Sequence, residues 1–387
     1  SNGSYNANEL YVQKSDTNGH FSNNAAVALA GISANGSQTG DMIEVIQKLE
    51  LDSFGYGNSK ENLAVQVQKL APIVNTSFAQ TSISATKLVT DTVGSRLSDT
   101  RGLSSGDAIA DKGVWAKVIG STASQDKVGQ FDGYSLSSAG VVFGIDKELQ
   151  NNTIIGLAAG YTNTKTEQDD FRDGDSSTTD SYQLSLYASK TFDKAYIDGA
   201  LSYTKHNTDG TRSSAIGREA SYDVDANQLS AKINGGYNFL FENKVTLTPF
   251  ASLEYSNIKQ DSYKEKGAGA ISLSVDDVTV NRGAAGLGVK ISKEIKTEDN
   301  VVYIPEFKLG ANKYFGDEDV EVTAQFDQGN KFVTKGAEMS DMMYNAGLGV
   351  KTKFTEDTSV SLSTDYERSN DGDFQGVNGQ LTFRMQF

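Results

Sequence analysis

Apolar side chains recur at every second position along most of the chain from residue 113 onward. At the C-terminus, Leu381, Phe383, Met385 and Phe387 alternate with polar residues. Successive side chains of a β-strand point to opposite faces, so this pattern predicts strands with one apolar and one polar face. Twelve such strands are predicted, around residues 114–118, 139–145, 155–161, 182–188, 197–203, 229–239, 245–255, 285–291, 303–311, 344–350, 360–366 and 381–387.

The connections between these strands alternate in length. Short connections lie at residues 149–152, 193–194, 242–243, 297–299 and 355–357. Long hydrophilic connections lie at residues 121–133, 165–180, 207–221, 258–275, 316–340 and 368–376. A soluble sandwich has no reason to sort its loops by length, whereas outer-membrane barrels have tight periplasmic turns, longer external loops and an even number of strands. The pattern predicts an all-β membrane protein with a 12-stranded antiparallel transmembrane β-barrel at residues 113–387, and a soluble β-sandwich is the alternative.

The first hundred residues have the period of a helix. Apolar residues are spaced by three and four at residues 25–32, 41–49 and 59–70. A further helix is predicted at residues 78–98, where the apolar residues stand among Ser, Thr, Gln and Ala. It would rise about 31 Å, close to the ~25 Å height of a barrel's apolar band, and it is too polar for a soluble core. We expect residues 1–74 to be helical or irregular and residues 75–112 to form a helix threading the lumen and a hinge.

The inward positions of the predicted strands are small or charged, which suits a wet or filled lumen. They are Gly140, Gly144, Asp146, Gly156, Ala158, Gly160, Asp198, Lys232, Glu254, Lys290, Glu306 and Arg384. Unpaired charges are penalised in a narrow lumen. The helix cations Lys87 and Arg96 are therefore expected to contact the inward carboxylates Asp198, Glu254 or Glu306, although the sequence does not say which pairs form.

Two further patterns bear on the barrel. Aromatic residues lie near strand ends on the outward face, where a membrane girdle belongs, although aromatics are also good strand formers. They are Tyr161, Tyr203, Tyr237, Tyr255, Tyr303, Phe354 and Tyr366. Pro249 and Pro305 interrupt strand pairing but follow short turns, where pairing can start late.

Composition excludes several classes of protein. The 387 residues contain no cysteine, so no disulfide, thiolate metal site or cysteine nucleophile exists. The net charge of -15 and the lack of any Lys/Arg run argue against nucleic acid as a partner. No window approaches the ~18 apolar residues of a membrane helix. Residues 1–24 lack the pattern of a signal peptide, as expected of a mature or excised fragment or of a chain that is not exported.

No catalytic, cofactor or metal site is predicted. Gly102–Gly106 reads GLSSG, but a hydrolase elbow needs a strand before it and a helix after it, so a flexible hinge is expected. The two histidines are His20, in a polar tract, and His206, expected at the start of a long loop. The acidic residues 169–175 lack EF-hand spacing and are expected to be a solvated loop, with weak calcium binding as the minority reading. No P-loop is present.

Four strings carry a family resemblance: GVWAKVIGS in the first strand, GVVFGIDKEL in the second, TLTPFASLEY in the seventh and YIPEFKLGANKY in the ninth. With the preceding polar helix and the terminal Phe387, they resemble the translocator domain of classical monomeric autotransporters (type V secretion) over about residues 74–387. The stretch before it is similar to helical regions of surface-antigen autotransporters of obligate intracellular bacteria. The resemblance implies a monomer in the bacterial outer membrane that carries its own passenger, an adhesin or surface antigen, to the cell surface.

The resemblance also implies partners and an assembly signal. The partners are outer-membrane lipid and lipopolysaccharide, the barrel-assembly machinery and periplasmic chaperones. Leu381, Phe383, Met385 and Phe387 correspond to the signal read by that machinery. Some members cut their passenger at paired asparagines in the lumen helix, but residues 78–98 contain no Asn, the nearest being Asn75. The alternative functions are an outer-membrane diffusion pore and a soluble β-rich adhesin.

Overall fold

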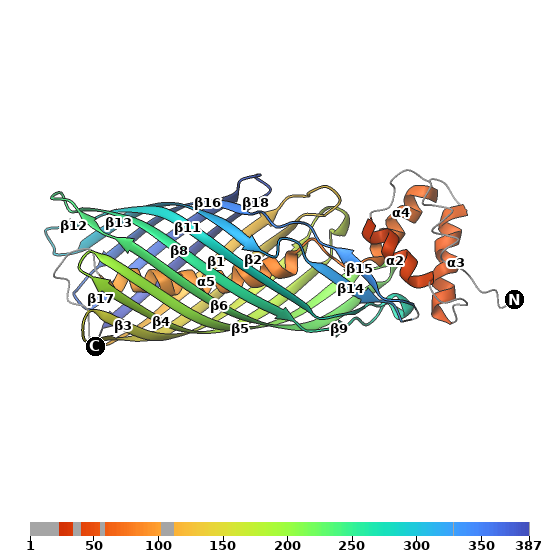
Figure 1. Ribbon diagram of the computed structural model, residues 1–387, viewed down its shortest axis with the longest axis horizontal. Helices are drawn as coiled ribbons and strands as arrows, with labels where there is room; N and C mark the ends of the chain where they lie inside the picture. Colours follow the sequence, from red (N-terminus) through yellow and green to blue (C-terminus); the bar gives the residue numbers. More distant parts are fainter. Residues whose placement is uncertain (1–22, 34–39, 55–58, 102–111, 328, 387) are drawn as a thin grey trace.

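The computed structural model describes residues 23–33, 40–54, 59–101, 112–327 and 329–386. In this part of the chain, twelve strands form a closed antiparallel barrel (Figure 1). They are β1 (Lys112–Gln125), β2 (Tyr134–Leu149), β3 (Thr153–Gln168), β4 (Ser176–Phe192), β5 (Ala195–Ser213), β6 (Glu219–Tyr237), β8 (Val245–Gln260), β11 (Val278–Lys293), β13 (Val302–Gly316), β16 (Met342–Lys353), β17 (Thr358–Ser369) and β18 (Phe374–Gln386). Pairing of β1 with both β2 and β18 closes the wall, which confirms the predicted 12-stranded barrel.

Tight turns lie at the end of the barrel where β1 begins and β18 ends (Figure 1). Only Asp193 and Lys194 join β4 to β5. Asp193 has a φ of 57°, and Asn151 and Asn152, between β2 and β3, have φ of 68° and 55°. Asp and Asn tolerate this left-handed backbone better than most residues do, and tight hairpins require it. The short connections therefore carry residues that suit them.

The strands run further toward the long-loop end than the alternation predicts. Residues 165–180 and 207–221 were expected to be loops, but the connection between β3 and β4 spans only residues 169–175 and that between β5 and β6 only residues 214–218. Both loop predictions were wrong because outward positions such as Lys165 are polar there. Toward the long loops the outward positions become polar, so apolar and polar residues no longer alternate there. The hydrogen bonding between neighbouring strands nevertheless continues.

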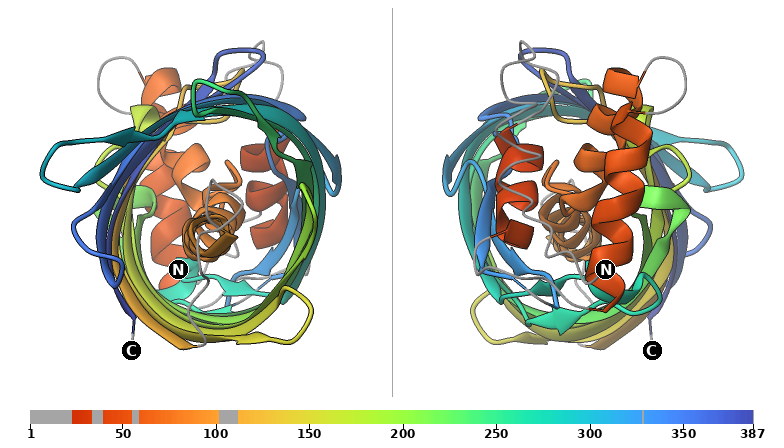
Figure 2. Two further views of the ribbon diagram at one scale, coloured as in Figure 1. Left: turned by 90° about the vertical axis from the view of Figure 1, so that its left-hand side faces the viewer. Right: turned by 90° about the vertical axis from the view of Figure 1, so that its right-hand side faces the viewer.

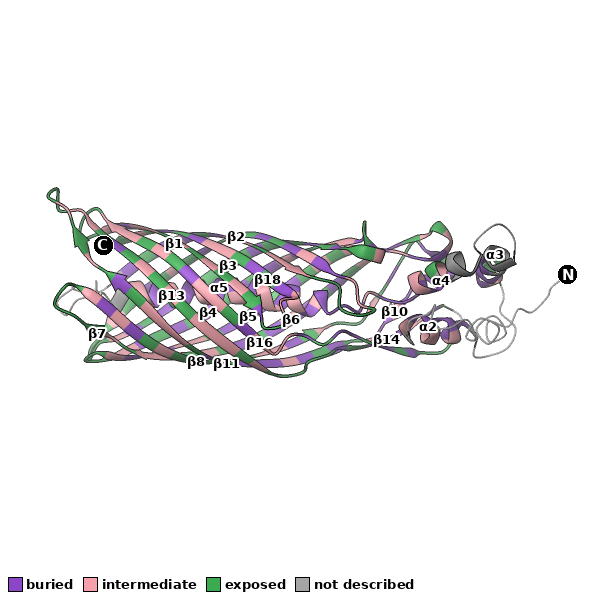
Figure 3. Cartoon of the chain, turned by 90° about the horizontal axis from the view of Figure 1, so that it is seen from above, coloured by how far each residue is buried: buried purple, intermediate pink, exposed green. Residues whose placement is uncertain are grey.

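Exposed and buried positions alternate along the strands of the barrel (Figure 3), and many of the exposed positions are large apolar residues. Leu157, Leu184 and Leu201 are about half exposed on neighbouring strands. All seven predicted girdle residues are exposed as well: Tyr161, Tyr203, Tyr237, Tyr255, Tyr303, Phe354 and Tyr366. An outward face of this kind suits contact with lipid rather than water.

At each strand proline, the ladder is interrupted on one side. The pairing of β6 with β8 stops at Gly236 and Phe250, next to Pro249, and resumes in the short strand β7 (Phe239–Leu240). Pairing of β11 with β13 stops at Glu306, next to Pro305, and resumes in β12 (Ile295–Lys296). Because proline has no N–H to donate, these breaks cost the wall little.

The helices lie inside and above the barrel. Looking along the axis, α5 (Ser77–Arg101) lies within the ring of strands, as predicted from the sequence (Figure 2). Helices α2 (Asn23–Ser33), α3 (Asp41–Phe54) and α4 (Ser59–Leu70) lie beyond the long-loop end (Figure 1). Among the helices of the described ranges, none has the length and apolar character to cross a membrane. His20, the Gly102–Gly106 hinge and Phe387 lie outside the described residues.

The longest connections also contain regular structure that the sequence did not predict. A second sheet joins β9 (Tyr263–Lys264), β10 (Ser274–Val275), β14 (Glu321–Gln325) and β15 (Phe332–Lys335). Short 3-10 helices η1 (Asp170–Arg172), η2 (Ala215–Gly217) and η3 (Gly269–Ile271) lie in the loops. With α2–α4 these pieces form what we call the cap.

Candidate functional site

One side of α5 is seated against the wall formed by β1 to β4. Val89 and Val93 of the helix are nearly fully buried there. The apolar cluster consists of Leu88, Val89, Val93 and Leu97 of the helix with Trp115, Ile119, Val142, Ile154, Ala158 and Tyr187 of the wall. These wall residues were not in the predicted inward set, except Ala158. The lumen is therefore apolar on this side, and the helix packs onto it as onto a protein core.

Glycines of the wall let the helix and the lumen aromatics approach closely. A Cβ added to Gly160 would lie 2.9 Å from Cγ1 of Val89. A Cβ on Gly144 would lie 2.2 Å from the ring of Trp115, and one on Gly156 would lie 2.2 Å from the ring of Tyr187. No side chain fits at these distances, so the inward glycines form the floor of the seat.

Arg96 is held by a buried network near the C-terminal end of the helix. Its Nε and Nη2 donate to the two carboxylate oxygens of Asp146, at 2.7 and 2.6 Å. Tyr187 Oη donates to the same carboxylate at 2.8 Å, and Trp115 Nε1 donates to Tyr187 Oη at 2.8 Å. Arg96 is only 1% exposed. A bidentate pair that is further hydrogen-bonded gives both direction and energy, so this network fixes the position of the helix along the lumen.

The opposite side of α5 carries a chain of charges. Lys87 pairs with Asp91 one turn along the helix. Asp91 is also 3.1 Å from Nζ of Lys232, and Lys232 is 3.8 Å from Glu254 on the next strand. Each of these side chains keeps about a quarter of its surface exposed. They face a cavity of about 260 Å³ that is also lined by Gly94, Ser98, Glu306 and Lys308.

Three lysines from the wall contact the last turns of the helix. Lys117 Nζ donates to the Thr92 carbonyl at 2.8 Å, and Lys290 Nζ donates to Ser98 Oγ at 2.7 Å. Lys351 lies 3.6 Å from Asp99. Cations near a helix C-terminus complement its dipole. Lys117 and Lys351 were missed in the sequence, although strand alternation beside outward Val118 and Val350 would have placed them inward.

The predicted helix contacts differ in their partners. In the described lumen, neither Lys87 nor Arg96 forms a direct ion pair with Asp198, Glu254 or Glu306. Arg96 pairs with Asp146 instead, and Lys87 pairs with Asp91 on its own helix. Glu254 reaches the helix through Lys232, and Glu306 lies 3.6 Å from Lys290. Asp198 accepts a hydrogen bond from Ser189 on the adjacent strand. The two helix cations therefore pair with Asp146 on the wall and Asp91 on the helix, and not with the three predicted carboxylates.

Polar contacts hold the other end of the helix. Asn75 accepts the N–H of Ser77 at the helix start and donates to Gln168 at 2.6 Å. Thr86 donates to Gln228, which is hydrogen-bonded to His206 at 2.9 Å. The prediction that His206 lies in a loop was wrong, because it is a buried lumen residue of β5.

The acidic segment 169–175 serves structural contacts. Asp170 accepts the N–H of Gly133 at 2.9 Å. Asp175 accepts the N–H of Ser213 at 2.8 Å and lies 3.4 Å from Arg172. Within the described ranges, no group of three or more His, Asp or Glu residues is arranged to hold a metal ion.

Sequence comparisons give the chain relatives of known kind. A family model described as "Autotransporter beta-domain" matches residues 114–365. An "Extracellular serine protease" of Serratia marcescens is 27% identical over 342 residues, which cover 86% of this chain and 32% of that protein. "Outer membrane protein B" of Rickettsia typhi is 24% identical over 377 residues, which cover 87% of this chain and 22% of that protein. The chain thus spans a third or less of the length of these curated relatives.

Solved structures share the fold. The translocator domain of the autotransporter NalP from Neisseria meningitidis matches with a TM-score of 0.59 and 19% identity, over 79% of this chain and 98% of that chain. The beta domain of the Bordetella autotransporter BrkA matches with a TM-score of 0.56 and 16% identity, over 72% of this chain and 100% of that chain. The family match spans more than half of the chain, so this protein belongs to the autotransporter beta-domain family and forms a β-barrel of the bacterial outer membrane.

Proposed function

We propose that this chain is the translocator and membrane anchor of an autotransporter, which carries the segment N-terminal to its lumen helix to the cell surface. The observation that carries this proposal is the path of the chain. Strand β1 begins at the tight-turn end of the barrel, whereas α5 runs through the lumen to α2–α4 at the long-loop end (Figure 1). Tight turns face the periplasm in outer-membrane barrels. The segment before α5 therefore lies outside the cell, on a path through the pore.

The related proteins support a proposal for the type of passenger that the chain carries. They include a protein named for extracellular protease activity and outer membrane proteins of Rickettsia, of which this chain spans the smaller part. We infer a passenger of the surface-antigen or adhesin type. We assign no enzymatic role to the barrel itself in this proposal, and the lumen residues Asp146 and Lys117 are assigned to holding the helix. We place the passenger remnant at residues 1–74, the lumen helix and hinge at 75–112, and the barrel at 113–387.

The outer surface and the last strand support the proposed partners. Leu381, Phe383 and Met385 of β18 are exposed on the outward face, and Phe387 follows them in the sequence at the same two-residue spacing. We propose that these four residues are the signal for the barrel-assembly machinery, with periplasmic chaperones acting before it. The exposed apolar band would contact outer-membrane lipid and lipopolysaccharide, with the barrel as a monomer.

Because the chain has no cysteine, single introduced cysteines can test the path. Glu44 on α3 and Glu242 in a tight turn are both exposed glutamates, so Glu44→Cys and Glu242→Cys are matched variants. A membrane-impermeant maleimide applied to intact cells is expected to label Glu44→Cys and not Glu242→Cys, and both should react after lysis. Labelling of Glu242→Cys alone on intact cells would reverse the topology and end the proposal.

A further inference from the structure

The segment joining α4 to α5, residues 71–76, is largely buried within the cap, although Ile73 is partly exposed and residues 71–75 line a cavity of about 930 Å³. Ala71, Val74, Asn75 and Thr76 are each less than 10% exposed. Backbone groups are bonded too, since the Val74 carbonyl accepts the N–H of Ala337 at 3.2 Å. Proteases cut exposed, unpaired chain, so this segment is a poor substrate as long as the cap stays in place.

Two arginines of the barrel, Arg172 in the β3–β4 loop and Arg212 near the end of β5, bind the C-terminal end of α4. Arg172 Nη2 donates to the carbonyls of Ala71, at 2.7 Å, and Gln68, at 3.2 Å. Arg212 Nη1 donates to the carbonyl of Lys69 at 2.7 Å. The last carbonyls of a helix have no donors within the helix and carry partial negative charge. The long-loop end of the barrel therefore supplies charged donors to the carbonyls at this helix end.

This pair of arginines is itself held in position. Arg212 makes a bidentate pair with Glu265, at 2.8 and 2.7 Å, and both side chains are 2% exposed. Arg172 donates to the Ser213 carbonyl at 2.6 Å and lies beside Asp175. Burial lowers the pKa of Arg172 to about 10, which still leaves it charged at neutral pH. The guanidinium groups thus form a preorganised receptor.

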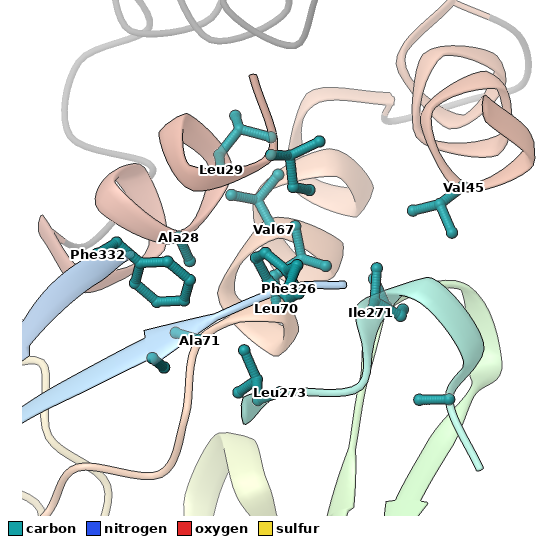
Figure 4. Packing of buried hydrophobic residues seen from close by; sticks show 14 of the residues in the cluster. Ala28, Leu29, Val45, Val67, Leu70, Ala71, Ile271, Leu273, Phe326 and Phe332 are labelled. Carbon is teal, nitrogen blue, oxygen red and sulfur yellow. The ribbon is translucent and has the colours of Figure 1, made fainter. Parts of the chain in front are cut away.

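The helices of the cap share their apolar core with the loops. Leu29, Val67 and Leu70 of the helices pack with Ile271 and Phe326 of the loops (Figure 4). At the rim of the cap, Arg218 donates to both carboxylate oxygens of Asp41, at 2.6 and 2.7 Å. The hydrogen bonds from Arg218 and from the N–H of Ala270 hold the pKa of Asp41 at about 2, well below the usual value.

We propose that the Arg172 and Arg212 guanidiniums are a receptor for the C-terminal end of α4. This contact keeps α2–α4 in place in the cap and shields residues 71–76 from proteolysis. The partner of this surface is the chain's own N-terminal part. A passenger removed by a protease would then leave from a point before the cap rather than at the lumen helix. The receptor acts in the same way whether or not a passenger is exported, so its test is independent of the translocator proposal.

The test compares how fast a protease cuts residues 71–76 in the parent protein and in its variants. All of them are full chains folded in detergent. A broad-specificity protease is added, and fragments are identified by intact mass over time. In the parent protein, bonds between residues 71 and 76 are expected to outlast those of exposed loops. In Arg172→Ala/Arg212→Ala, loss of these charged hydrogen bonds should speed the appearance of a fragment starting within residues 72–76 by about tenfold or more. Asp41→Asn removes an equally charged but peripheral contact of the cap and is the matched control.

Heat-dependent gel mobility reports separately that the barrel has folded, since both arginines lie outside the apolar band. If the double variant does not fold, Arg212→Lys keeps the charge and loses the bidentate fork, and it should show the same change more weakly. Cleavage at residues 71–76 in the parent protein as fast as in the double variant would overturn the proposal. So would equal sensitivity of Asp41→Asn, because protection would then come from the packing of the cap and not from the two arginines.

Discussion

The two sides of the lumen helix meet opposite surroundings. Val89 and Val93 lie against β1 to β4 in a dry apolar seam that ends in the buried pair of Arg96 and Asp146. Lys87 and Asp91, on the other side, face a cavity of about 260 Å³ and reach the wall mainly through Lys232. Along residues 87–97, the helix therefore packs against one half of the barrel and meets the other half through charged side chains. Nearer its start, Ala79 packs in an apolar cluster with residues of β8 and β11.

The two sides of the helix therefore have different roles: one fixes the position of the helix, and the other fills the remaining space of the lumen. Packing against glycines and a bidentate ion pair specify where the helix lies, because neither tolerates a shift of an ångström. Lysine chains in a hydrated space adapt to such a shift, since their four-carbon stems are flexible. The seam fixes the register of the helix, and the charged side keeps the rest of the lumen polar. Substitutions on the two sides should consequently differ in size and even in sign.

Removing Arg96 should give the largest effect. Arg96→Ala leaves the Asp146 carboxylate buried with no cation, which costs about 3–5 kcal/mol in a protein interior. We expect the free energy of unfolding of the detergent-folded protein to fall by that amount and the conductance in planar bilayers to rise as the helix loosens. Arg96→Met/Asp146→Leu removes both charges and should cost clearly less. A loss below about 1 kcal/mol for Arg96→Ala would contradict the seam as the anchor.

Adding a side chain to one of the glycines under the helix should have the second-largest effect. The Cβ of Gly160→Ala would lie 2.9 Å from Val89, a stiff side chain on the helix, so the helix or the strand has to move. Overpacking of this kind costs about 1–3 kcal/mol. The melting temperature should fall, and Val89→Ala in the same chain should recover part of the loss. If the double variant is no better than the sum of the two single ones, the contact between helix and floor is not the cause.

The barrel could be predicted because lipid imposes a period of two on every strand that it touches. The same reason explains why strand lengths were underestimated. Above the band, the outward face of a strand meets water and the inward face carries buried polar residues such as Thr166 and Thr179, so residues 165–180 and 207–221 carry no apolar alternation although β3 to β6 continue there. The two-residue turn at Asp193 could be predicted because an alternating strand stands on each side of it. The second sheet, formed by β9, β10, β14 and β15, could not be predicted because its strands are too short to show a period.

The sequence predicted which kinds of residue line the lumen, but not which of these residues pair with one another. Lys87 and Arg96 could be assigned to the helix, and Asp146 to the inward set, from position alone. Which carboxylate Arg96 meets depends on the rotation and height of the helix, and these follow from the contact of Val89 with Gly160 and from Trp115 over Gly144. Such contacts join residues about 30 to 70 positions apart, and no local pattern encodes them.

On the charged side, Lys232→Ala should have a smaller effect than either change in the seam. Lys232 is 26% exposed, and its partner Asp91 keeps Lys87 after the substitution. Ion pairs with access to water contribute about 1 kcal/mol or less and are screened by salt. We expect a small decrease in the free energy of unfolding that shrinks further in about 1 M salt. A salt-insensitive loss of several kcal/mol would show that this side is as dry as the seam.

Gly94→Ala should give an effect no larger than that of Lys232→Ala in order of magnitude, and of the opposite sign. Gly94 lies in the interior of α5 on the cavity side, and a Cβ there would have no heavy atom within 4 Å. Alanine is favoured over glycine in a helix interior by about 1 kcal/mol, because glycine loses more backbone freedom on folding. The melting temperature should therefore rise slightly, whereas the same glycine-to-alanine change at Gly160 lowers it. Destabilisation by Gly94→Ala would mean that the wall closes onto this side of the helix, and the two halves of the lumen would then hold α5 alike.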